Sequence, residues 1–166
     1  MLHRIAVVSS VIALTPLLGV QTASAAGDWL WPVSGPVIRP FDAPDSPYGT
    51  GHRGIDIAGA VGTPVRAPAP GVVAFSGPVG GSLFVTVDHG GGLESTYSWL
   101  LAVSVRRGDA VGAGTTLASS GEGHPGVTPA HLHFGVRMND VYVDPMEYLG
   151  AGSVVGLIRL APLAPA

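Results

Sequence analysis

Glycine and proline interrupt this sequence so often that long helices have little room in it. The chain has 25 Gly and 15 Pro among 166 residues, about twice the ordinary share of these two residue types. Short apolar runs lie between the breakers, and they show no clear 3.6-residue apolar period. The pattern predicts an all-β fold built from short strands.

About nine segments combine β-branched and aromatic residues with flanking turn residues, as is typical of strands. They are residues 37–39, 54–58, 65–67, 71–75, 82–87, 93–97, 115–118, 131–137 and 141–143. Strands this short and this closely spaced indicate an antiparallel sandwich or a small barrel. The proline-rich segment 40–50 is expected to be a loop.

The first 25 residues have the features of a cleaved secretory signal. Arg4 precedes an apolar stretch over residues 5–20, and Ala-Ser-Ala at 23–25 provides the small residues of a cleavage site. A membrane anchor is the alternative, but the stretch is short for a span of about 20 residues. We expect a secreted chain with no membrane span after cleavage. Residues 26–150 would form one domain and residues 151–166 an Ala/Pro/Gly-rich tail.

Composition excludes several kinds of function. The formal net charge is −3, so no basic surface for nucleic acid is expected. The sequence has no lysine, which excludes biotinyl or lipoyl carriage and Schiff-base chemistry. It also has no cysteine, so the fold depends on packing or on a metal ion, not on disulfides.

Two short motifs carry metal-binding residue types. One is His52-x-Gly54-x-Asp56 and the other is His131-x-His133. On a strand, His131 and His133 lie on the same side. His52 and Asp56 would be about 13 Å apart on a straight strand, but a bend at Gly54 would turn both inward. Two histidines and a carboxylate, with a water, form a ligand set of catalytic zinc.

Two further histidines, and iron as an alternative to zinc, have to be weighed against this interpretation. His89, at a strand end before three glycines, is expected to be structural. His124, in a Gly/Pro loop, is expected on the surface. Non-haem iron oxygenases also use two histidines and a carboxylate. They usually space the first pair as H-x-D, so we favour zinc; iron with oxygen-dependent turnover would support the oxygenase.

From residue 31 to residue 150 the sequence resembles the lysostaphin-type (LytM-type) zinc endopeptidases, which cut peptide cross-links in bacterial cell walls. The resemblance rests on motifs that occur in the same order, at residues 52–56, 62–65, 87–90, 107–109, 131–134 and 143–145. It implies an antiparallel β-sandwich with a duplicated hybrid motif of lipoyl/biotinyl-like type.

The resemblance also implies the roles of four residues. His52, Asp56 and His133 would be the ligands of Zn²⁺, and His131 would position or deprotonate the metal-bound water. The implied substrates are stem or bridge peptides of peptidoglycan, and we expect the protein to act as a monomer.

One departure from the family pattern concerns the second active-site histidine. Family members usually carry Tyr-x-His-Leu, where this chain has Tyr-Ser-Trp-Leu at residues 97–100. Trp99 therefore replaces the histidine, and an indole can only donate a hydrogen bond. An active peptidase and a catalytically impaired cell-wall-binding or hydrolase-activating domain both remain open. The intact ligand set favours the enzyme, and His124 is a possible substitute for the missing imidazole.

Overall fold

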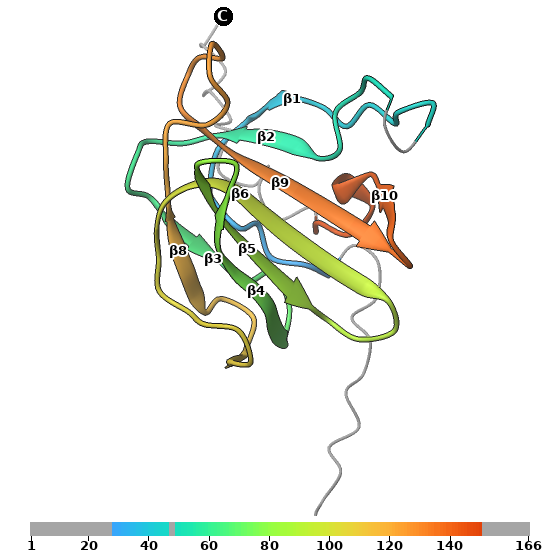
Figure 1. Ribbon diagram of the computed structural model, residues 1–166, viewed down its shortest axis with the longest axis vertical. Coiled ribbons are helices and arrows are strands. Elements are labelled where there is room, and N and C mark those ends of the chain that lie inside the picture. The colour runs from blue at the N-terminus through green and yellow to red at the C-terminus, as the bar shows by residue number, and fades with distance from the viewer. Residues whose placement is uncertain (1–27, 47–48, 151–166) are drawn as a thin grey trace, which may run out of the picture.

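The computed structural model describes residues 28–46 and 49–150, which form ten strands and one 3₁₀ turn (Figure 1). The strands are β1 (Val37–Arg39), β2 (Ile55–Ala58), β3 (Pro64–Arg66), β4 (Gly71–Val79), β5 (Ser82–Asp88), β6 (Leu93–Val103), β7 (Ala110–Val111), β8 (Thr116–Ser120), β9 (His131–Met138) and β10 (Val141–Val143), and the turn is η1 (Pro145–Glu147). These strands pair only in antiparallel fashion. The prediction of an all-β antiparallel fold is confirmed.

The long strands β6 and β9 lie side by side across the middle of the molecule (Figure 1). The sheet order is β1-β2-β9-β6-β5-β4-β7, with β10 beside β9. β6 pairs with β9 over Leu93–Ser98 and then with β8 from Leu100 to Val103. It changes partner at Trp99, the residue between the two ladders. The connection between β8 and β9 therefore begins next to Trp99.

The pairing of β2 with β9 decides which side chains share a face. Asp56 lies opposite His133, and Ala58 opposite His131. The pairs that alternate with these, Ile55 with Phe134 and Ile57 with Leu132, point to the other face and are 0–1% exposed. Because side chains alternate along a strand, the aliphatic pairs enter the core while Asp56 and both histidines stay together on the opposite face.

Three local differences separate the observed strands from the predicted ones. β4 continues through Pro78 and β6 continues through Trp99, although both residues were expected to lie beyond a strand end. Pro78 pairs with β5 on one side only, and proline is tolerated in such an edge strand because it has no N–H to offer outward. Trp99 is accommodated by a bulge, with φ at 61°. The two-residue strand β7 is not among the nine segments expected to be strands.

The predicted secretory signal at 1–25 and the predicted tail at 151–166 lie outside the described residues. Within the described part of the chain, no helix has the length and hydrophobicity required to span a bilayer.

Candidate metal centre

His52 is positioned just before β2 by backbone and side-chain hydrogen bonds. Its N–H donates to the carbonyl of Asp42 at 2.8 Å, and its own carbonyl accepts from Asp42 N–H at 3.0 Å. The ring atom Nδ1 lies 2.7 Å from the Pro40 carbonyl. Since a carbonyl oxygen only accepts, Nδ1 carries the proton, and a neutral His52 presents the Nε2 lone pair to the opposite side.

His52 and Asp56 meet, as predicted, because the segment before β2 is not extended. His52 Nε2 lies 3.0 Å from Asp56 Oδ1. Gly54 contributes to this arrangement mainly by close packing. A Cβ at this position would collide with the backbone carbonyl of Phe134 and would lie 2.9 Å from His133 Nε2. Glycine therefore lets the chain before β2 approach β9.

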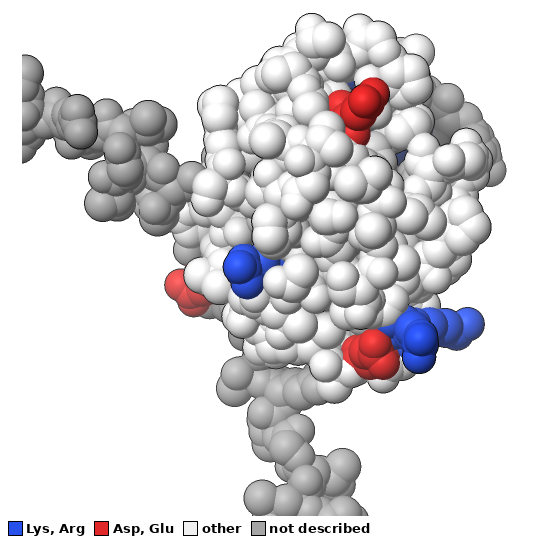
Figure 2. All heavy atoms as spheres, turned by 90° about the vertical axis from the view of Figure 1, so that its left-hand side faces the viewer, with Lys and Arg blue, Asp and Glu red and all other residues white. Residues whose placement is uncertain are grey.

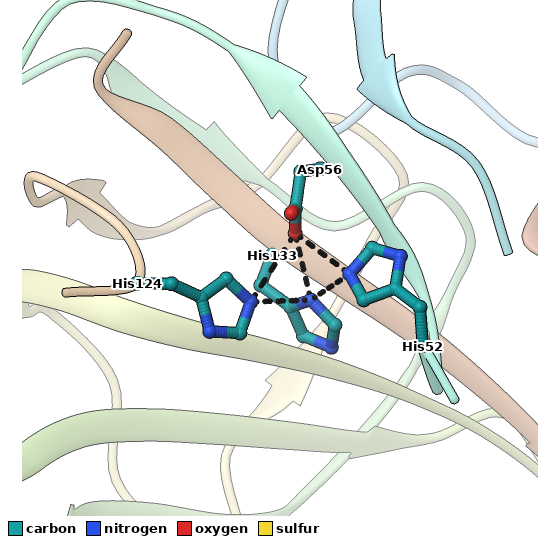
Figure 3. A group of neighbouring side chains, drawn as sticks. All are labelled: His52, Asp56, His124 and His133. Atoms are coloured by element: carbon teal, nitrogen blue, oxygen red, sulfur yellow. Dashed lines mark hydrogen bonds and ion pairs between the residues drawn. The ribbon is translucent and has the colours of Figure 1, made fainter. Parts of the chain in front are cut away.

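Asp56, His52 and His133 converge on one point from two strands and a loop (Figure 3). His133 Nδ1 lies 2.8 Å from Asp56 Oδ1 and 3.0 Å from His52 Nε2. Two imidazole nitrogens and a carboxylate oxygen at these distances repel one another unless a cation, a proton or a metal ion, lies between them. The second oxygen of Asp56, Oδ2, is buried without a hydrogen-bond partner. The donor set fits a divalent ion that accepts nitrogen and oxygen ligands.

His124 joins this cluster from the loop between β8 and β9 (Figure 3). Its Nε2 lies 3.2 Å from His133 Nδ1 and 3.4 Å from Asp56 Oδ1. The side chain is half-buried, at 26% exposed, and it contacts the cluster, whereas a histidine without such contacts was expected. No sequence motif marks His124, because its spacing to His131 and His133 acquires meaning only through the path of the loop.

His131 lies beside the cluster but is not one of the four converging residues. Its Nδ1 donates to the Pro129 carbonyl at 2.9 Å, and its Nε2 accepts the backbone N–H of His124 at 3.0 Å. Both ring nitrogens are thus engaged, and the side chain is fully buried. The same Nε2 also lies 3.9 Å from Asp56 Oδ2.

Two pKa shifts describe the electrostatics of the cluster. Burial raises the pKa of Asp56. Hydrogen bonds and charge interactions with His133 and His52 together lower this pKa by more than burial raises it, so the net shift is downward. Burial lowers the pKa of His124 more than the Asp56 carboxylate raises it. The cluster therefore combines a carboxylate with an imidazole that tends to be neutral at pH 7, which is the protonation state that metal ligation requires.

Trp99 forms one wall of a shallow groove next to the cluster. Its ring centroid is 5.2 Å from that of His124, at an interplanar angle of 50°. The groove encloses about 220 Å³, and its lining includes Arg53, Phe84, Trp99, His133 and Tyr142. His124 also belongs to the lining, so the groove opens onto the metal cluster.

The chain belongs to Peptidase family M23, which matches residues 50–145. The resemblance to lysostaphin-type peptidases is thereby confirmed. An uncharacterized protein of Mycobacterium tuberculosis (strain H37Rv) is 38% identical over 164 residues, covering 94% of this chain and 64% of that protein. The murein hydrolase activator NlpD of Escherichia coli K12 is 32% identical over 130 residues, covering 77% of this chain and 33% of NlpD. The chain thus spans less than two thirds of these curated relatives.

Solved structures show the same family likeness. A zinc containing peptidase from Vibrio cholerae is 25% identical, with a TM-score of 0.62 over 73% of this chain and 40% of that chain. The catalytic domain of the antimicrobial peptidase lysostaphin from Staphylococcus simulans is 27% identical, with a TM-score of 0.55 over 64% of this chain and 86% of that chain.

Proposed function

We propose that this chain is a zinc metallopeptidase of the bacterial envelope that hydrolyses peptide bonds in peptidoglycan stem or bridge peptides. The observation that carries the proposal is the approach of His52 Nε2, Asp56 Oδ1 and His133 Nδ1 to within 2.8–3.0 Å of one another. We assign these three residues as metal ligands. Membership of family M23 and likeness to a zinc containing peptidase support zinc as the metal.

The roles of the surrounding groups follow from their hydrogen bonds. Bound zinc would supply a Lewis acid and a water ligand with a pKa of about 7. The Pro40 carbonyl holds the His52 ring so that Nε2 faces the ion. We assign His131 Nε2 as the atom that takes the proton from the nucleophile. This atom accepts the His124 N–H in the described conformation, so His131 acts once that hydrogen bond opens.

The test combines metal analysis with hydrolysis of purified peptidoglycan, with and without a chelator. The parent protein should hold one zinc and release soluble peptides, and chelation should stop the release. His52→Ala, Asp56→Ala and His133→Ala should each lose most of the zinc. Glu122→Ala, an exposed change in the neighbouring loop, should keep it. If two of the three ligand variants bind zinc like the parent, the ligand assignment is wrong.

His131→Ala separates a base from a ligand in the same assay. Zinc should remain close to stoichiometric while the rate falls by about 10²–10⁴, the usual contribution of a general base. Loss of zinc would instead make His131 a ligand.

Trp99 favours a second candidate, a wall-binding or hydrolase-activating domain without peptidase activity. The relative NlpD carries the name of a murein hydrolase activator, and Trp99 lacks the proton chemistry of the usual histidine. Trp99→His decides between the two candidates. For a slow enzyme, it should raise hydrolysis by up to about 10²–10³ with unchanged zinc, since this is the usual contribution of one transition-state donor. No hydrolysis by either form would support the activator.

The proposal includes the organisation of the chain. We propose export directed by residues 1–25, a peptidase domain over residues 26–150 and a tail over residues 151–166. The site of action would be the cell wall or the extracellular side of the envelope, and the chain would act as a monomer.

A further inference from the structure

The metal cluster contains one more donor atom than the proposed function uses. Five of the six distances among His52 Nε2, Asp56 Oδ1, His124 Nε2 and His133 Nδ1 are between 2.8 and 3.4 Å. The four ligand atoms all lie within 4.8 Å of one another. A tetrahedral ion with zinc–ligand bonds of about 2.0–2.1 Å separates its ligands by about 3.3 Å. The four side chains therefore already approximate a closed tetrahedral site.

We propose that His124 is a fourth protein ligand of the metal and that the β8–β9 loop, residues 121–130, closes the site in the resting protein. The inference rests on the proposed zinc site and adds its resting coordination. Structural zinc sites have four protein ligands, whereas catalytic sites keep one position for water. With His124 bound, the water position is filled.

Several contacts fix the β8–β9 loop in the orientation that points His124 at the cluster. Gly121 N–H donates to the Trp99 carbonyl at 3.0 Å, and Val127 N–H donates to the His124 carbonyl at 3.2 Å. Gly123 has φ at 90°, and a Cβ there would collide with the ring of His131. The loop thus packs directly on His131, and the Trp99 ring lies against the His124 ring.

His124 blocks two catalytic requirements through different atoms. Its side chain occupies the fourth ligand position, and its backbone N–H occupies the Nε2 lone pair of His131. A single displacement of the loop at His124 would therefore open a position for water and free the base together. In this position the loop keeps the site closed.

The test counts imidazole ligands by zinc K-edge X-ray absorption on the zinc-loaded full chain. The parent and the loop control Glu122→Ala should each show three imidazoles and one oxygen ligand. His124→Ala should show two imidazoles. It should bind zinc at least about tenfold more weakly, because removing even a residue that only hydrogen-bonds a metal ligand usually costs that much affinity. His124→Phe keeps a ring against Trp99 and should behave like His124→Ala, which guards against a folding defect.

A probe of the fourth position completes the experiment. In cobalt-loaded protein, azide should change the visible spectrum of His124→Ala at concentrations at least about tenfold lower than those the parent requires. Two imidazoles in the zinc-loaded parent, or equal azide binding by parent and variant, would overturn the fourth ligand and leave the three-ligand site intact. A parent that holds no zinc would instead overturn the proposed function.

Discussion

The five histidines that follow residue 25 occupy three different environments. His52, His124 and His133 face the metal cluster, and His131 holds the β8–β9 loop. His89 is structural, as predicted: Nδ1 donates to the Pro70 carbonyl at 2.8 Å, and Nε2 lies 2.8 Å from Ser95 Oγ. The environment of each ring, more than its sequence motif, decides what that histidine can do.

His89 should make the stability of the fold depend on pH. Burial lowers the pKa of His89 below its ordinary value, more than the Pro70 carbonyl and nearby carboxylates raise it. As the pH falls below about 6.5, His89 binds a proton in the unfolded chain but not in the folded chain. The free energy of unfolding therefore decreases until the pH reaches the pKa of His89 in the folded protein. His89→Gln removes this titration.

The measurement is urea unfolding of the parent and of His89→Gln at several pH values between about 7.5 and 5. The parent should be the more stable protein at the upper end. Its advantage should shrink on acidification, by at most about 1.4 kcal/mol per pH unit. An advantage that stays constant or grows would contradict a neutral buried His89.

At the scale of elements, the contact between the chain before β2 and strand β9 should couple folding to metal binding. Gly54→Ala places a methyl group against the Phe134 carbonyl and must push the two segments apart. We expect a loss of about 2–4 kcal/mol in the free energy of unfolding, together with weaker zinc binding. Gly59→Ala is the control, since a Cβ at Gly59 meets nothing within 4 Å. Equal stability of the two variants, measured by urea unfolding, would refute the coupling.

Most strands could be predicted from sequence because their apolar alternation and turn residues are local. Polar and apolar side chains alternate clearly over residues 131–137, and this pattern predicted that His131 and His133 share a face. The partner change of β6 at Trp99 could not be predicted, because it depends on strands β8 and β9 that are distant in sequence. The position of His124 could not be predicted either, since it is set by loop contacts with Trp99 and His131.

At the scale of the whole molecule, charge is sparse. On the face shown in Figure 2, acidic and basic side chains are few, and no large patch of one sign is present. The formal net charge of −3 agrees with that picture. Long-range steering of a charged polymer requires a strong field of one sign. Recognition of the proposed peptide substrate would therefore depend on short-range contacts in the groove beside Trp99.

The outer edge of β4 has a consequence for colloidal behaviour. β7 pairs with Gly71 and Val72, and the turn before β7 bonds the backbone of Val73 through Gly108 and Asp109. Beyond this point Phe75 and Val79 are 39% and 50% exposed. An apolar edge of this kind invites a second chain to add a strand. Pro78 interrupts the edge because it has no N–H, and we expect this to protect the folded protein from aggregation.

Replacing that proline should reveal the protection. Pro78→Val restores the N–H with a β-branched side chain, so light scattering at rising protein concentration should detect self-association that the parent lacks. Pro78→Lys restores the same N–H but adds a charge that opposes strand addition, and it should remain dispersed. If both variants stay dispersed, Pro78 has no protective role. In a chain with so few surface charges, one ring on an edge strand would thus help to decide how concentrated the protein can become before it precipitates.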